Sequence, residues 1–389
     1  MAHVAAPSKK FWTPANIITV IILVIGLVLT VKRFTMGIGA VSNLSDDNPW
    51  GIWIGFDLLC GVALAAGGYT TTAAVYLFGM KKYHSAVRPA ITTAFLGYAF
   101  VVFALLYDLG RYYRLPYPLT IYPGPTSFLF EVGLCVALYL TVLAIEFSPF
   151  LWEVLGWAKI RHLVHKLTLA LTIFGVILST LHQSSLGGLY LIAPSKLHPL
   201  WYSIYLPLFF FLSSIPAGLS MVILEGTLSH KYLSHKMDED HHHGFSPVVL
   251  GFSKAASVVL FAYFCMKWIG VAMDNNWSYL GTGWGLWFLV EVLGFVLLPC
   301  ILYAVAAREK NERVAFYASI MTVAGIILNR LNVSIIAFNW RLPAEARYFP
   351  SLEEFLITVF IVTLEITVLR ICLNKLPILH QHPQFRDAH

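Results

Sequence analysis

Charged residues are scarce in this chain of 389 residues. Asp, Glu, Lys and Arg make up 12% of the sequence, whereas about 25% is usual in a soluble domain. Hydrophobic residues make up 58%, and the mean hydropathy is +0.73. The sequence also lacks a long polar stretch that could form a separate soluble domain. This composition indicates a membrane protein, and we expect the net charge of +6 to reflect membrane topology, with no nucleic acid as partner.

Cysteine is equally sparse. Each of the five cysteines stands alone within an apolar run, and the sequence has no CxxCH motif for covalent haem. No closely spaced set exists for an iron–sulfur cluster or a structural zinc. We therefore expect no metal site and no iron–sulfur cluster in this chain. The cysteines, expected to be small buried residues, are Cys60, Cys135, Cys265, Cys300 and Cys372.

Histidine pairs that could hold a membrane haem are also lacking. A b-type haem needs two axial ligands at one depth, and His165 precedes His182 by 17 residues, which is roughly 25 Å along a helix. These two residues cannot share an iron, so we expect no haem. A haem b cytochrome nevertheless stays open as an alternative at the opposite membrane face. Its ligands there would be His162 or His165 with His230 or His235.

What the sequence does contain is a series of ten apolar runs of spanning length. About 20 helical residues cross the hydrocarbon core of a bilayer, and a spanning segment must satisfy its own backbone hydrogen bonds. We therefore predict an all-α polytopic membrane protein with ten transmembrane helices. Helices 2–5 and 6–9 are expected to form two four-helix bundles, flanked by helices 1 and 10. The runs are 15–34, 50–78, 89–108, 126–147, 163–181, 201–224, 248–273, 282–305, 314–338 and 355–373.

The Lys and Arg residues between these runs predict the orientation. With the N-terminus inside, 17 of the 26 lie in inside segments and 7 in outside segments. Cytoplasmic loops carry the excess of positive charge, so both termini are expected in the cytoplasm. The first run is long enough to span, and we expect no cleaved signal peptide. The inside segment 229–247, with three histidines beside three acids, is expected to be a solvated loop.

Polar residues gather in the outer layer of helices 2–5. Asp57 lies in the apolar stretch PWGIWIGFDLLCG, where a charge costs about 2.5–3.5 kcal/mol on insertion scales. Each of these residues also has a purely structural explanation, such as a pair between Asp108 and Arg111, but together they favour a polar pocket in an apolar cavity. The group consists of Asp57, Asp108, Glu131, His182, Gln183 and Ser184.

A quinone would suit such a pocket, because it combines an apolar ring and tail with two carbonyl oxygens. A histidine can hydrogen-bond one carbonyl and pass its proton, and a desolvated carboxyl can relay protons. We predict that His182 and Asp57 act on the quinone. A second polar set could form a proton path or an internal charge-paired frame: Glu225, Glu291, Arg330, Asn332 and Glu365.

Several motifs resemble the NrfD/PsrC superfamily, that is, the membrane subunits of polysulfide and nitrite reductases. They are similar above all to the membrane subunit of type-2 nickel–iron hydrogenase (HybB-like) and to that of the high-molecular-weight cytochrome c complex of sulfate reducers. The resemblance covers about residues 14–380. Its motifs are PWGIWIGFDLLCGVALAAGG, YHSAVRPA, DLGRYYRLPY, LHQSSLGGL, KLHPLW, VILEGTL and IAFNW…YFPSLEEFLIT.

The resemblance implies a subunit of an oxidoreductase complex in the bacterial inner membrane, with no redox cofactor of its own. It implies a periplasmic ferredoxin-like iron–sulfur partner, a hydrogenase or multihaem cytochrome c further out, and other membrane subunits. Menaquinone would bind near the periplasmic face, in a pocket formed by the residues of the outer layer. The direction of electron flow stays open. An alternative from another class is an ion-coupled secondary transporter, whose acids would bind the coupling ion.

These inferences divide the chain into four predicted parts. Residues 1–48 form the first helix and an outer loop, and residues 49–188 the first four-helix bundle with the quinone pocket. Residues 189–340 form the second bundle, and residues 341–389 the last helix with a cytoplasmic tail.

Overall fold

The computed structural model describes residues 13–380 of the chain. In these residues it contains ten helices that are long and apolar enough to cross a membrane, which confirms the all-α polytopic prediction. The two ends of the chain lie outside the described residues. They include Lys9, Lys10 and Arg386, which were counted among the inside Lys and Arg residues.

Six spans are single regular helices: α1 (Pro14–Met36), α4 (Val87–Asp108), α6 (Phe128–Leu155), α7 (Ala158–Gly188), α8 (Leu206–Leu233) and α9 (Glu239–Met273). The last span, α13 (Leu352–Lys375), is a seventh. The other three are built from several pieces. Short connecting helices are η1 (Ile38–Ala40), η4 (Lys81–Ala86), η5 (Tyr112–Arg114), α5 (Tyr117–Thr120), η6 (Leu189–Ile192), η7 (Ser234–Lys236), η8 (Asn276–Gly281) and η11 (Ala344–Ala346).

The three composite spans contain wide π-helical turns, in which hydrogen bonds run from residue i to i+5. The second span runs through η2 (Trp53–Leu58), α2 (Leu59–Leu64), α3 (Gly67–Thr72) and η3 (Ala73–Leu77), with a break at 65–66. The eighth consists of α10 (Gly283–Leu289), η9 (Val290–Leu297) and α11 (Leu298–Glu309), and the ninth of α12 (Glu312–Leu331) and η10 (Asn332–Ile336). Such turns are frequent at functional sites.

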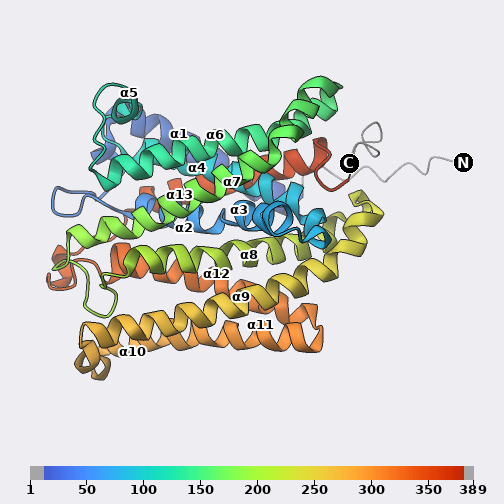
Figure 1. The fold of residues 1–389 in the computed structure, drawn as a ribbon. Helices are drawn as coiled ribbons and strands as arrows, with labels where there is room; N and C mark the ends of the chain where they lie inside the picture. Colours follow the sequence, from blue (N-terminus) through green and yellow to red (C-terminus); the bar gives the residue numbers. More distant parts are fainter. Residues whose placement is uncertain (1–12, 381–389) are drawn as a thin grey trace, which may run out of the picture.

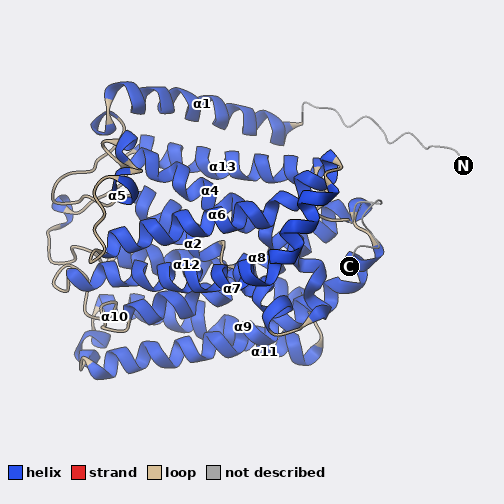
Figure 2. Cartoon of the chain, turned by 45° about the horizontal axis from the view of Figure 1, so that its top comes forward, coloured by secondary structure: helices blue, strands red, loops and turns tan. Residues whose placement is uncertain are grey.

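The spans pack as two groups of four with two flanking helices. The second span, α4, α6 and α7 contact one another, and so do α8, α9, α11 and α12. Helices α1 and α13 lie together at one side, and α13 also packs on α4, as Figures 1 and 2 show. We call the end where α1 begins and α13 ends the inner end, and the opposite end, which carries α5, the outer end (Figure 1).

One loop prediction is wrong in part. The segment 229–247 is mostly helical, because α8 continues to Leu233 and α9 already begins at Glu239. The side chain of Asp238 caps α9 by accepting a hydrogen bond from the His241 amide, and acids in the first turn complement the helix dipole. The three histidines therefore lie on a helix.

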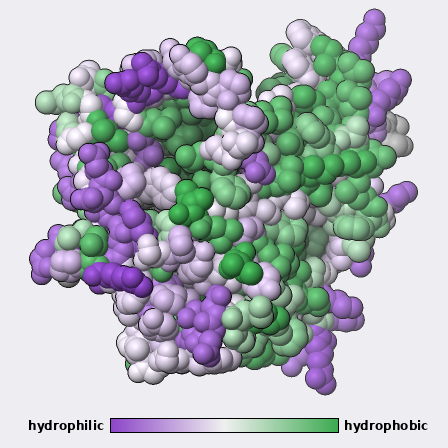
Figure 3. Space-filling view, turned by 60° about the vertical axis from the view of Figure 1, so that its left-hand side comes forward, coloured by the Kyte–Doolittle hydropathy of each residue, from purple (hydrophilic) through white to green (hydrophobic). Residues whose placement is uncertain are grey.

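The surface has the polarity expected of a membrane protein. In Figure 3 the outer end is largely hydrophilic, whereas the flank of the helices beside it is hydrophobic. On α1, large apolar side chains such as Val24, Leu27 and Val28 are more than half exposed, which water would disfavour and lipid would not.

Candidate functional site

His182 is fully buried inside the first bundle, and both of its ring nitrogens are engaged. The Nδ1 atom lies 3.0 Å from the carbonyl oxygen of Leu178, which can only accept, so Nδ1 carries the proton. The Nε2 atom then accepts a hydrogen bond from the hydroxyl of Tyr98 at 2.6 Å. Helix geometry therefore sets the tautomer of His182, and Tyr98 occupies its basic nitrogen.

Around this pair lie polar atoms that have no hydrogen-bond partner in the described part of the chain. They are the hydroxyls of Tyr139 and Ser179 and the Oε1 atom of Gln183. The ring of Tyr139 packs edge-on against Tyr98 with centroids 4.7 Å apart, and Gln183 donates through Nε2 to the carbonyl of Val62 at 3.0 Å. Buried polar atoms normally find partners, so this cluster has capacity for a ligand or for water.

Asp57 lies on a different side of the second span. It is buried on the π-helical turn η2 and accepts a hydrogen bond from the hydroxyl of Thr358 in α13 at 2.8 Å. Its carboxyl lines a cavity of about 230 Å³ between the second span, α4, α8 and α13, together with the carboxyls of Glu225 and Glu365. Thr93 donates to Glu225 at 2.6 Å. Most of the remaining lining is apolar, so three acids share one apolar cavity.

The predicted outer-layer residues are thus distributed over separate surroundings. His182 contacts Tyr98 within the first bundle, whereas Asp57 faces α13. Asp108 is the last residue of α4, and the buried Arg33 lies beside it. Arg33 donates to the carbonyls of Tyr107 and Leu109, which flank Asp108 in the chain, at 2.8 and 2.7 Å. The Asp108 Oδ1 atom itself has no partner in the described residues. Glu131 lies in the first turn of α6, and Ser184 lies half-buried on α7.

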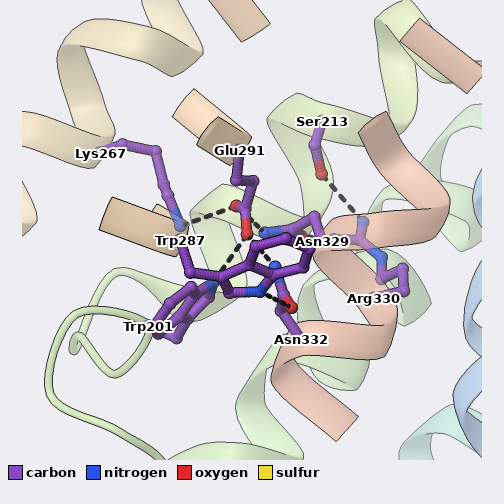
Figure 4. Close-up of polar contacts among 8 residues, drawn as sticks. All are labelled: Trp201, Ser213, Lys267, Trp287, Glu291, Asn329, Arg330 and Asn332. Atoms are coloured by element: carbon purple, nitrogen blue, oxygen red, sulfur yellow. Dashed lines mark hydrogen bonds and ion pairs between the residues drawn. The ribbon is translucent and has the colours of Figure 1, made fainter. Parts of the chain in front are cut away.

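The second predicted set also divides into two groups. Glu225 and Glu365 line the cavity with Asp57, whereas the other three residues belong to a hydrogen-bonded network in the second bundle (Figure 4). Its centre is Glu291, fully buried on the π-helical turn η9. Its carboxylate accepts from Trp201 at 2.7 Å, from Asn329 at 2.7 Å and from Asn332 at 2.5 Å, and Lys267 lies 3.5 Å away.

Arg330 extends this network toward the first bundle. Its guanidinium donates to Asn329 at 2.8 Å and to Ser213 at 2.9 Å, and it lies 3.8 Å from the centre of the Phe210 ring. The network therefore joins α8, α9, α12 and the eighth span. Two cations and one carboxylate are held there among amide, hydroxyl and aromatic groups, which is how membrane proteins accommodate buried charge.

Sequence reasoning missed a third charged group at the inner end. Glu153, buried near the end of α6, forms ion pairs with Arg88 and Arg161 at 2.9 Å each. With Glu146 these residues line a cavity of about 80 Å³ that also includes His165. Glu146 lies within the apolar run 126–147, near its end, so the rule that singled out Asp57 would have found it. His230 lines a different cavity from His165.

His198 lies in an aromatic box at the outer end. Its Nδ1 accepts a hydrogen bond from the Leu200 amide at 3.2 Å, and the rings of Trp201, Trp284 and Trp340 surround it with centroids within 5.6 Å. Burial among these rings lowers the pKa of His198 to about 4. The His198 ring is therefore uncharged near neutral pH and packs among the aromatic rings of the outer loops.

Fold and polar clusters together define a class: a ten-helix membrane protein with acids gathered inside its bundles. Comparison of the sequence with known proteins supplies the family. The profile of the family described as "Polysulphide reductase, NrfD" matches residues 40–339, and the chain belongs to this NrfD family.

Several relatives align over nearly their whole lengths. A protein of Nitratidesulfovibrio vulgaris is 66% identical over 100% of both chains. The probable Ni/Fe-hydrogenase 2 b-type cytochrome subunit of Escherichia coli is 35% identical, over 92% of this chain and 90% of its own. The menaquinone reductase integral membrane subunit of Nitratidesulfovibrio vulgaris is 28% identical over the same shares.

Proposed function

We propose that this chain is the quinone-interacting membrane subunit of a respiratory redox complex in the bacterial inner membrane. It exchanges electrons between a periplasmic ferredoxin-like iron–sulfur subunit and menaquinone, with a hydrogenase or multihaem cytochrome c further out. Support comes from two relatives, one named as the probable b-type cytochrome subunit of Ni/Fe-hydrogenase 2 and the other as the integral membrane subunit of a menaquinone reductase. The chain itself contributes a binding site and proton-transferring groups.

The observation that carries this proposal is the cavity with three carboxyls. An apolar space of about 230 Å³ lined by Asp57, Glu225 and Glu365 suits a quinone ring. The two quinone oxygens exchange protons when the ring is reduced or oxidised, and carboxyls can supply or accept those protons. Asp57 is nearest the outer end, because its helical turn begins the second span there. Electrons would enter from that side, where the iron–sulfur partner is proposed to dock.

His182 contributes in a different way from Asp57. Because Tyr98 occupies its Nε2 atom, His182 could bond a quinone oxygen only after that hydrogen bond is broken. The unpartnered Gln183 Oε1 and Tyr139 hydroxyl beside it could take part in the same rearrangement. The roles of Asp108, Glu131 and Ser184 at the pocket follow from the family resemblance.

Protons reach the site through the second polar set in this proposal. Glu225 and Glu365 are the nearest members, since both line the Asp57 cavity, and Glu225 also lines the larger cavity toward the inner end. Glu291, Arg330 and Asn332 do not line this cavity and belong to the hydrogen-bonded network of the second bundle (Figure 4). Their dense hydrogen bonding supports a role as a charge-paired frame.

The test compares the turnover of menaquinone by the purified complex in four variants. We expect Asp57→Asn to slow turnover by about 10²-fold or more, as loss of a proton-transferring group does. His182→Ala should abolish turnover with assembly intact, and Tyr98→Phe should reproduce part of that loss. Glu353→Gln is the matched control, because this partly exposed acid at the outer end forms its one ion pair within the described residues with Lys32. Unchanged turnover in Asp57→Asn would remove Asp57 from the mechanism.

One observation also suits an ion-coupled transporter. The second span is interrupted at 65–66, next to a cavity that holds three acids, and transporters bind coupling ions at such broken helices. Ion-driven uptake by the lone chain in vesicles would support this function. Copurification of an iron–sulfur protein and of menaquinone would support the redox function, and a haem band in the spectrum of the isolated chain would indicate a cytochrome.

A further inference from the structure

A second and larger cavity lies at the inner end, between the C-terminal halves of α8 and α13. It has a volume of about 530 Å³ and is floored by the beginning of α4, at Pro89, Ala90 and Thr93. Leu228 and Tyr232 on one wall are 39% and 64% exposed, and Ile366 on the other is 54% exposed. The cavity therefore opens sideways through the apolar flank, where hydrocarbon chains of the membrane would lie. We call it the lateral crevice.

A polar pocket adjoins the lateral crevice at its inner edge. It has a volume of about 230 Å³ and shares Ser85 and His241 with the crevice. Its other lining residues are Lys81, Lys82, His84, Arg88, Asp240 and Gly244. Arg88 is held in an ion pair with Glu153, which also pairs with Arg161. Lys81 and Lys82 are exposed and form no ion pair in the described residues, so the pocket presents two available cations against the single carboxylate of Asp240.

Polar side chains also face the crevice from its wall. His241 donates through Nδ1 to Asp238 at 2.7 Å, which leaves its Nε2 atom buried without a partner in the described residues. The Nδ1 atom of His230 is likewise buried and unpartnered, with its ring stacked 4.4 Å from that of Phe245. Arg370 is exposed at the mouth on α13, and Glu225 closes the deep end.

We propose that the lateral crevice and its polar pocket bind an anionic phospholipid of the inner leaflet. The shape and polarity correspond to such a molecule: an apolar space that opens toward the membrane core, next to a cationic pocket at the depth of the headgroups. Basic pockets between helices on the cytoplasmic side bind anionic lipid headgroups. An acyl chain lies in the crevice, and the phosphate lies against Lys81 and Lys82. His241 and Ser85, at the junction, hydrogen-bond the polar atoms between head and chain.

This inference does not depend on the proposed redox function. It needs only that the inner end faces the cytoplasm, which the distribution of Lys and Arg predicts. A quinone is the less suitable occupant, because it carries no negative charge to match the cationic pocket beside the crevice.

The test measures lipid retained by the full chain after purification in mild detergent, with headgroup classes quantified by mass spectrometry. We expect wild type to retain anionic phospholipid, and Lys81→Gln/Lys82→Gln to retain several-fold less of it. The matched control is Arg308→Gln/Arg313→Gln, which removes two exposed cations from the turn between α11 and α12 at the same end. That control should retain as much as wild type. Equal retention in both double variants would overturn the proposal.

A second variant blocks the apolar part without removing charge. A Cβ atom added at Gly226 would meet only Phe245, at 4.0 Å, so Gly226→Leu places its side chain in open space within the crevice. We expect it to fold and to lose the bound lipid while Lys81 and Lys82 remain. Undiminished lipid in Gly226→Leu would overturn the proposal. The proposal would also be overturned if wild type retained only zwitterionic lipid. The same holds if wild type retained menaquinone and Gly226→Leu displaced it.

Discussion

At the scale of single residues, the buried acids differ in how completely they are hydrogen-bonded. Glu291 accepts from three side chains and has Lys267 beside it, whereas Glu365 makes no hydrogen bond in the described part of the chain. A carboxylate that accepts from several buried donors supports the groups around it, whereas no donor depends on a carboxyl without hydrogen bonds. Glu291 therefore suits a structural frame in the second bundle, whereas Glu365, on the flanking helix α13, is proposed to exchange protons.

The first prediction follows from this contrast. Glu291→Ala leaves Lys267 without its counter-ion and three buried donors without their acceptor, so we expect a loss of about 3–5 kcal/mol in the free energy of unfolding. Glu365→Ala should cost less, because no donor depends on it. Thermal unfolding of the purified chain in detergent measures both. Equal losses, or a stable Glu291→Ala protein with slowed proton transfer, would contradict the role of Glu291 as a frame.

A second prediction at this scale concerns the pH dependence of His198. Its pKa is lowered from 6.5 to about 4, so the unfolded chain binds more protons than the folded chain between these values. The contribution of His198 to stability is therefore present above pH 6.5 and is lost as the pH falls toward 4. We expect proteolytic cleavage of the outer loops to increase as the pH falls from 6.5 toward 4.

The control for this experiment is His198→Phe, which keeps a ring in the aromatic box and removes the titration. Its cleavage should vary less with pH than that of wild type. The same pH dependence in both proteins would assign the effect to other groups.

At the scale of helices, the π-helical turns coincide with the polar clusters. Asp57 lies on η2, Glu291 on η9 and Asn332 on η10. A wide turn frees backbone groups and changes the direction of the side chains that follow. These turns decide which neighbour each polar group meets, and periodicity in the sequence did not predict them.

A close crossing between α3 and α8 gives a third prediction. A Cβ atom added at Gly218 of α8 would overlap the backbone nitrogen of Gly67 in α3. The atoms in contact belong to the backbones of both helices, which cannot rotate away as a side chain can. Gly218→Ala should therefore destabilise the chain by about 1–3 kcal/mol. The matched control is Gly294→Ala, where no atom lies within 4 Å of the new carbon. Equal melting temperatures for the two variants would contradict the crossing.

At the scale of the whole molecule, the outer and inner ends differ in the polar clusters and cavities that they carry. The outer end carries the His198 box and Asp108, and the inner end carries the Arg88–Glu153–Arg161 cluster and the lateral crevice. In our proposals, the electron-delivering partner docks at the outer end and the anionic lipid binds at the inner end.

Orientation in the membrane gives the fourth prediction. Lys196 is exposed at the outer end. A cysteine at this position, in a chain without its native cysteines, should be alkylated by a membrane-impermeant reagent from the periplasm. A cysteine in place of Arg313 should react only after the cytoplasm is opened. The reverse pattern would invert the topology.

The sequence alone was sufficient for the class of the protein and the approximate positions of its ten spans, because a bilayer sets the length and apolarity that each helix needs. It also singled out Asp57 and His182 as polar residues that require an explanation. It did not predict the wide helical turns, the helical start of α9 or the Arg88–Glu153–Arg161 cluster.

Only the tertiary structure decided which of these residues meet. Asp57 bonds Thr358, which lies 301 residues away, and shares its cavity with Glu225 and Glu365, while His182 faces Tyr98 across the first bundle. The physical reason is that hydrophobicity specifies how deep a residue lies in the membrane. The rotation of each helix about its axis depends on packing against neighbours that are distant in the chain.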